Sequence, residues 1–152
     1  MSSPERDLAE VSRVLLQKAE EDATAVREFA GNPDIADAII GFHAQQAVEK
    51  WLKAVIAARG VQYRAIHDID RLVEMLETTG IAISLDRDRL VVLTQYAVPL
   101  RYDELLDAES LERDTLVALV NEVREWVEEQ AQPHVDLLEE DEEPPAGESG
   151  NG

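Results

Sequence analysis

The chain of 152 residues contains no cysteine. This absence excludes disulfide bonds, thiolate catalysis and zinc sites built from cysteine. No apolar run approaches the roughly 20 residues that a membrane-spanning helix needs. The first seven residues also contain no apolar signal-peptide core. We therefore expect a cytoplasmic protein without a membrane anchor.

Positive charge is scarce, because 14 Lys and Arg face 33 Asp and Glu and leave a net charge of −19. Such a surface repels phosphate backbones, so the net charge argues against RNA as a partner. The charge is uneven, however. Residues 39–67 have a net charge of +3, whereas residues 1–38 carry −5 and residues 68–152 carry −17. Of the three segments, only the middle one is positive, and it also contains His43 and His67.

Glycine and proline are few and fall between long stretches with helical periodicity. No stretch shows the alternation of a strand bounded by hairpin turns. Asp34 suits the start of the second helix, and Gly60 suits its end. The fold class is therefore all-α, an up-and-down bundle of four to five helices over residues 1–131. The expected helices cover residues 7–30, 34–59, 67–79, 86–98 and 107–131.

Residues 132–152 differ in composition from the rest of the chain. They contain seven acidic side chains and no Lys or Arg, and they end in a segment rich in Pro and Gly. Such a sequence buries too little apolar surface to offset the entropy of ordering. We expect an acidic, disordered C-terminal tail. It either keeps the protein in solution or competes with an anionic ligand for the basic segment.

The second helix has an apolar stripe at spacings of 3 and 4 residues. Its small alanines allow close approach of a neighbouring helix, and Trp51 is the large anchor. These positions predict the central helix of the core. The stripe consists of Ile40, Ala44, Ala47, Trp51, Ala54 and Ala58, widened by Val48, Leu52 and Val55.

A polar stripe follows the same helix, because His43, Gln46, Lys50 and Lys53 are spaced 3, 4 and 3 residues apart. Two of the three lysines of the chain are in this stripe. Two neighbouring ammonium groups in an acidic protein attract a phosphate or an acidic partner. The alternative is a solvated face with Glu49 and distant carboxylates as counter-ions.

Two further sites lie at the ends of expected helices. His67 and Asp68 stand where the third helix begins, and Asp68 suits the first turn. His67 is either a capping or packing residue or a ligand contact. Arg101 and Tyr102 lie on a loop between two helices, where arginine clasps a phosphate or carboxylate and tyrosine stacks or donates. Otherwise Arg101 binds a helix end or one of the many carboxylates.

Three blocks of the sequence resemble the HEPN domain family. They are Phe-His-Ala-Gln-Gln-Ala-Val-Glu-Lys-Trp-Leu-Lys-Ala at 42–54, His-Asp-Ile at 67–69 and Arg-Tyr at 101–102. Their order and spacing agree with the family over about residues 7–131. The resemblance implies a small helical bundle that forms homodimers and pairs with a minimal nucleotidyltransferase. It also implies one of two roles: a ribonuclease toxin of a toxin–antitoxin pair, or a non-catalytic module associated with nucleotide or RNA.

The ribonuclease members carry an arginine followed, after four to six residues, by a histidine. In such a site the histidine handles the proton and the arginine the developing phosphate charge. None of the three histidines here, His43, His67 and His134, has an arginine at that spacing. A composite site across a dimer, made by Arg101 with His67 or His43, stays open. The chain also lacks a Glu-x-x-His pattern, a glycine-rich phosphate loop and a Ser–His pair.

The function that these observations favour is a non-catalytic HEPN-type binding module that dimerises and binds a nucleotide, a minimal nucleotidyltransferase, or both. No catalytic residue, metal ligand or cofactor is expected. One alternative is a metal-independent ribonuclease toxin of a toxin–antitoxin pair. The other is a purely structural dimerisation subunit. The expected nucleotide- or anion-binding residues are Gln46, Lys50, Lys53, His67, Arg101 and Tyr102.

Overall fold

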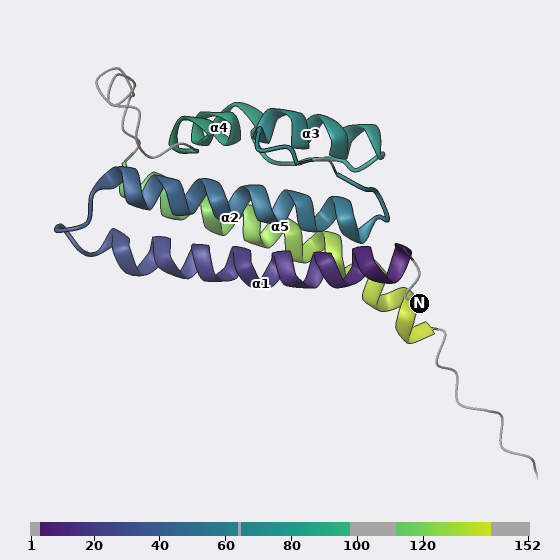
Figure 1. Ribbon diagram of the computed structural model, residues 1–152. Coiled ribbons are helices and arrows are strands. Elements are labelled where there is room, and N and C mark those ends of the chain that lie inside the picture. The colour runs from purple at the N-terminus through teal and green to yellow at the C-terminus, as the bar shows by residue number, and fades with distance from the viewer. Residues whose placement is uncertain (1–3, 64, 98–111, 141–152) are drawn as a thin grey trace, which may run out of the picture.

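The computed structural model describes residues 4–63, 65–97 and 112–140, and it describes side chains within residues 7–130 of these ranges (Figure 1). The described residues form five α-helices and one turn of 3-10 helix, and no strand. The expected all-α fold is therefore confirmed. The elements are α1 (Pro4–Ala30), α2 (Asp37–Ala58), α3 (Ile69–Thr78), α4 (Arg87–Val92), η1 (Leu93–Tyr96) and α5 (Arg113–Glu140).

The long helices α1, α2 and α5 lie side by side, and α3 and α4 cover the opposite side of α2 (Figure 1). Helix α5 begins beside the turn that follows α1, and further along it Arg124 binds Glu20 in the middle of α1 at 2.6 Å. Helix α5 therefore runs antiparallel to α1, as α2 does. Helices α2 and α5 thus run parallel to each other, and α2 lies at the centre of the bundle. Within the described residues, no helix is both long and apolar enough to cross a membrane.

Arg113 fastens the start of α5 to the turn between α1 and α2. Its guanidinium donates to the carbonyl oxygens of Asn32 at 2.8 Å and Ile35 at 2.5 Å, and to the carboxylate of Asp37 at 2.7 Å. It also reaches the last carbonyl groups of α1, which have no partner within that helix. A cation at this end complements the helix dipole.

The start of α2 differs from the expectation at Asp34. The helix begins at Asp37, and its N-cap, Ala36, offers no side-chain hydrogen bond. Asp34 is instead in a turn in which its own N–H donates to the Asn32 side chain at 2.9 Å. This local hydrogen bond competes with helix capping, and it places the helix start three residues later.

Helix α2 ends at Ala58, directly before its C-cap Arg59 and Gly60, as the position of this glycine predicts. Gly60 has a φ of 74°, in the left-handed region that favours glycine. Its N–H donates to the carbonyl of Ala57 at 2.9 Å, and Val61 N–H donates to that of Ile56 at 3.3 Å. These two bonds form a Schellman motif, which satisfies carbonyl groups at the helix end.

Helix α5 runs past the boundary that the composition places at residue 131. The helix extends to Glu140, and Pro133 does not end it. Residues 132–140 contain Leu, Glu and Gln, which are good helix formers. Residues 141–152, the rest of the expected acidic tail, lie outside the described residues, as do residues 98–111.

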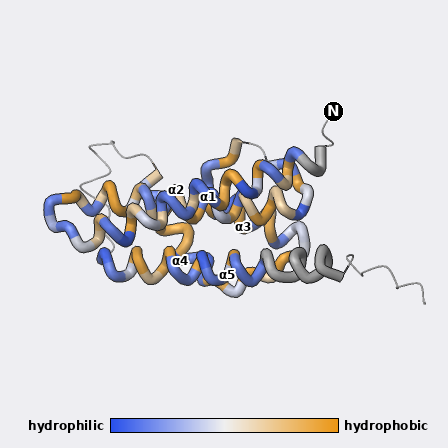
Figure 2. Tube along the Cα trace, turned by 90° about the horizontal axis from the view of Figure 1, so that it is seen from below, coloured by the Kyte–Doolittle hydropathy of each residue, from blue (hydrophilic) through white to orange (hydrophobic). Residues whose placement is uncertain are grey.

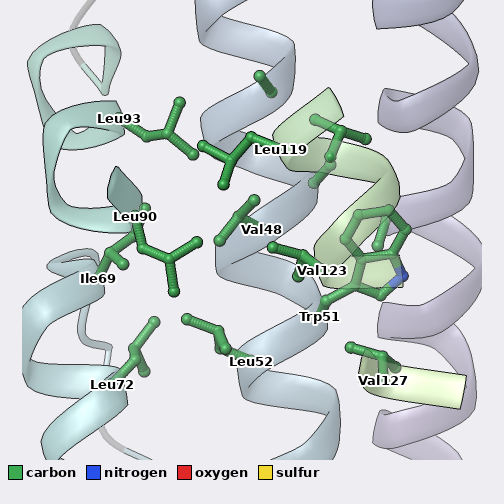
Figure 3. Packing of buried hydrophobic residues seen from close by; sticks show 14 of the residues in the cluster. Val48, Trp51, Leu52, Ile69, Leu72, Leu90, Leu93, Leu119, Val123 and Val127 are labelled. Atoms are coloured by element: carbon green, nitrogen blue, oxygen red, sulfur yellow. The ribbon is translucent and has the colours of Figure 1, made fainter. Parts of the chain in front are cut away.

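The core surrounds α2, and both sides of this helix contribute to it. Figure 3 shows Leu72 and Leu90 pointing toward Leu52 and Val48 across the space between α2 and the α3–α4 layer. Hydrophilic and hydrophobic residues alternate along the helices in Figure 2, as amphipathic helices require. Burying each Leu or Val side chain contributes about 1.5–3 kcal/mol. The apolar stripe of α2 is buried as expected, except for Ala58, which is exposed.

Helix α2 and the 3-10 turn η1 approach each other at Gly41. A Cβ atom added to Gly41 would overlap the ring of Tyr96. The lack of a side chain at this position therefore lets the Tyr96 ring lie against the backbone of α2. The contact closes one end of the α4–η1 layer over the central helix.

The α3–α4 layer is tied together by Arg87, which donates to Asp70 at 2.7 Å and to Glu77 at 3.4 Å. The hydrogen bond to Asp70 raises the pKa of the Arg87 guanidinium. Each helix of the layer has an aspartate N-cap. Asp68 accepts from the N–H of Asp70 at 3.0 Å, and Asp86 caps α4 in the same way. Helix α3 therefore begins at Ile69, two residues after the expected start at residue 67, and Asp68 is its N-cap instead of a residue of the first turn.

Candidate functional site

The polar residues of α2 meet carboxylates on both sides of the helix. We call this group the polar seam. It lies where α2 meets α1 on one side and the segment before α3 on the other. The polar seam consists of Asp22, His43, Gln45, Gln46, Glu49, Lys50, Lys53 and His67.

On the α1 side, Asp22 binds two residues of α2. Its carboxylate accepts from Nδ1 of His43 at 2.9 Å and from Nζ of Lys50 at 2.5 Å. An ionised carboxylate only accepts hydrogen bonds, so His43 carries its proton on Nδ1. The rings of Phe29 and Phe42 meet the His43 ring edge to face at 5.7 and 5.6 Å. The imidazole is thus fixed by one charged bond and two ring contacts.

On the α3 side, Glu49 is the centre of the polar seam, with only 4% of its side chain exposed. One carboxylate oxygen accepts from Nζ of Lys53 at 2.9 Å and from Nδ1 of His67 at 2.7 Å. The other accepts from the amides of Gln45 and Gln46 at 3.1 and 3.4 Å. Four donors therefore satisfy a carboxylate that has almost no access to water.

The two lysines of the predicted stripe have different surroundings. The Lys50 side chain is 28% exposed, whereas that of Lys53 is 10% exposed and lies over the ring of Tyr63 at 5.6 Å. Each ammonium group already binds a carboxylate. With neutral histidines, the two lysines and the carboxylates of Asp22 and Glu49 balance to zero. The stripe is thus neither a pair of free cations nor a solvated face.

His67 is the most exposed residue of the polar seam, at 74% of its side chain. It does not cap α3, because Asp68 does so. Its Nδ1 is held by Glu49, and Nε2 has no hydrogen-bond partner among the described residues. Glu49 therefore orients the ring and leaves Nε2 for a ligand or for proton transfer.

Sequence reasoning missed Asp22 and Gln45. Asp22 is on a different helix, and nothing in the spacing of α2 points to it. Gln45 is within the block at residues 42–54 that resembles the HEPN family, but it is not one of the positions of the polar stripe. The structure places Gln46, Lys53 and His67 of the predicted site around Glu49 and places Lys50 at Asp22, on the α1 side. Arg101 and Tyr102 lie outside the described residues.

The described residues contain no group of three or more His, Asp or Glu side chains that could hold a metal ion. A hollow between α1, α2 and α5, beside Ser12 and Arg59, has a volume of about 40 Å³. Pockets for nucleotide-sized ligands measure about 300–1,000 Å³, so this hollow is too small for one.

A family model of the HEPN domain matches residues 12–130, which is more than half of the chain. No curated protein and no solved structure gave a significant match. The matched range includes α2 with the whole polar stripe and ends near the last described side chains of α5. The chain belongs to the HEPN domain family.

Proposed function

We propose that this protein is a non-catalytic HEPN binding module whose polar seam binds the phosphate groups of a nucleotide. The observation that carries the proposal is the pairing of Lys50 with the half-buried carboxylate of Asp22 and of His67 with the buried carboxylate of Glu49. Asp22 and Glu49 hold these two side chains from the inside, so that their remaining polar groups face outward. A site of this kind is ordered before the ligand arrives, which lowers the entropic cost of binding.

The stability of the fold does not by itself explain the polar seam. Glu49, Lys53 and Gln45 are buried on the central helix. Burying an ion pair yields little net stability compared with apolar residues of similar volume. An apolar layer would pack the same helices without that desolvation cost. This comparison supports a functional reason for the charged residues.

The residues of the polar seam divide into contacts and positioning groups. Lys50 has three N–H donors, of which Asp22 uses one, so it has donors left for a phosphate. Nε2 of His67 donates a second hydrogen bond when the ring is protonated. Gln46 and Lys53 hold Glu49 in place from inside the protein. Arg101 and Tyr102 stay sequence-based predictions of further ligand contacts.

Isothermal titration calorimetry with ATP at low salt tests this proposal. Wild-type protein is expected to show saturable binding, and Lys50→Gln is expected to weaken it at least about tenfold, or about 1.4 kcal/mol. Lys18→Gln is the matched control, because Lys18 makes an exposed ion pair with Glu21 elsewhere on α1. Its affinity is expected to equal that of wild type. Equal weakening by both variants would show a general charge effect and would contradict the proposed site.

We also propose that the module forms a homodimer and pairs with a minimal nucleotidyltransferase. Family membership supports both proposals. A pairing of this kind would bring the nucleotide that the enzyme uses close to the polar seam. The purely structural alternative has the same dimer but predicts no ATP binding in the titration above.

A metal-independent ribonuclease is the second candidate, and the geometry of His67 favours it. A carboxylate on Nδ1 with Nε2 exposed is an arrangement suited to general acid–base catalysis. The binding-module proposal expects RNA to stay intact during long incubation with the purified full chain, as read on a denaturing gel. Cleavage that His67→Ala abolishes would instead favour the ribonuclease.

A further inference from the structure

We propose that Asp22 is an internal competitor for the ligand site: its carboxylate occupies Lys50 and His43 in the free protein, and an anionic ligand displaces it. The inference rests on the proposed function, because it concerns the same polar seam. According to this inference, Asp22 of α1 determines how tightly the site binds phosphate.

The position of Asp22 allows displacement. The Asp22 side chain is 13% exposed, and those of Lys50 and His43 are each 28% exposed. The ion pair therefore lies at the edge of the protein, where a ligand can reach the ammonium group. The Asp22 carboxylate accepts hydrogen bonds from two side chains, His43 and Lys50. Among the described residues, no residue of α1 donates a hydrogen bond to it.

Glu49 differs from Asp22 in both respects. Its carboxylate is almost completely buried and accepts from four donors. A phosphate that displaced it would leave a buried charge without a partner, which is strongly unfavourable. Of the two carboxylates in the polar seam, Asp22 is therefore the one that a ligand replaces.

The charge of Asp22 opposes binding for as long as it stays close to Lys50. A phosphate that binds Lys50 comes within a few ångströms of the carboxylate, and two anions at that distance repel each other. From the composition, the acidic tail was a candidate to compete with an anionic ligand for the basic segment. Asp22 supplies it from inside the bundle, at a fixed position.

Asparagine removes this charge and keeps the shape. His43 and Lys50 bind different oxygens of Asp22, so the single amide oxygen of asparagine still accepts from one of them and keeps one link between α1 and α2. With residue 22 neutral, the charge that occupies Lys50 is gone, and the ligand meets no repulsion from this position. Asp22→Asn is therefore expected to strengthen anion binding, the opposite of the usual result of changing a binding-site residue.

Calorimetric titration of the full chain with ATP, at one fixed low salt concentration, tests the inference. Asp22→Asn is expected to bind ATP about tenfold more tightly than wild type, or about 1.4 kcal/mol. Glu21→Gln is the matched control. It also removes one negative charge, from the residue next to Asp22, but Glu21 forms an exposed ion pair with Lys18. It is expected to change the affinity less than about twofold, because an exposed charge acts on the ligand only through water, where charge interactions are weak.

The outcomes separate the inference from the proposed function. If wild type binds ATP and Asp22→Asn binds no more tightly than Glu21→Gln, the inference is wrong and the proposed function stands. If no variant binds ATP, both are wrong. The gain in ATP affinity is also expected to vanish in the double variant Asp22→Asn/Lys50→Gln. Thermal melting confirms that each variant is folded, and Asp22→Ser takes the place of Asp22→Asn if the amide variant is not.

Discussion

Replacing Glu49 with alanine is expected to destabilise the protein by about 3–5 kcal/mol. The change removes the carboxylate that binds the ammonium group of Lys53 at 2.9 Å, and Lys53 is itself buried. It also leaves the buried amide of Gln45 without its acceptor. Urea unfolding followed by circular dichroism at 222 nm measures the effect.

An exposed ion pair provides the control. Arg89 and Glu122 connect α4 to α5 at 3.0 Å with side chains 41% and 47% exposed. Glu122→Ala is expected to cost less than about 1 kcal/mol, because exposed pairs contribute little. A loss of less than 1 kcal/mol for Glu49→Ala as well would mean that water reaches the Glu49 cluster.

A double substitution separates the charge from the packing. In Glu49→Leu/Lys53→Met both charged groups become apolar, and neither is left unpaired. Replacing buried ion pairs in this way is often neutral or stabilising. The double variant is therefore expected to be more stable than Glu49→Ala and yet to have lost the anchor of His67. The same reasoning makes Lys53→Glu unsuitable for a binding test, since it would place two buried carboxylates together.

Gly41→Ala is expected to destabilise the protein by about 3 kcal/mol, at the upper end of the usual cost of overpacking. The added Cβ overlaps the ring of Tyr96, which lies against α2. Either the ring or the whole η1 turn has to move. The change in the urea midpoint, with an unchanged slope, measures this cost.

Gly31→Ala is the matched control for Gly41→Ala. A Cβ at Gly31 meets no atom within 4 Å, and Gly31 is not one of the positive-φ glycines. Its expected effect is within about 0.5 kcal/mol of zero, as for most surface substitutions. Equal stability of the two variants would show that η1 packs less closely on α2 than the structure has it.

The fold could be predicted from the sequence because its helices are long and strongly periodic. Apolar residues at spacings of 3 and 4 identify α1, α2 and α5 without any knowledge of their neighbours. Helix ends were harder to predict. They depend on single hydrogen bonds, such as the turn that uses Asp34, and on whether helix formers continue, as they do past residue 131 in α5.

The candidate site could be predicted only in part, for a geometric reason. Lys50 and Lys53, three residues apart, point in directions about 60° apart around a helix with about 100° per residue. In the structure this angle is enough for Lys50 to reach α1 and for Lys53 to reach the α3 side. Asp22 is 28 residues from Lys50 in sequence. Its contact with Lys50 depends on how α1 and α2 are aligned. The spacing of residues along one helix gives no information about that alignment.

The measurement that tests the central claim most directly is an NMR titration of uniformly ¹⁵N-labelled protein with ATP. It follows the backbone amides and the imidazole nitrogens. We expect the largest shifts at the rings of His43 and His67 and at the amides around Lys50. Shifts that avoid the polar seam, or none at saturating ATP, would contradict the claim that these residues form an anion-binding site.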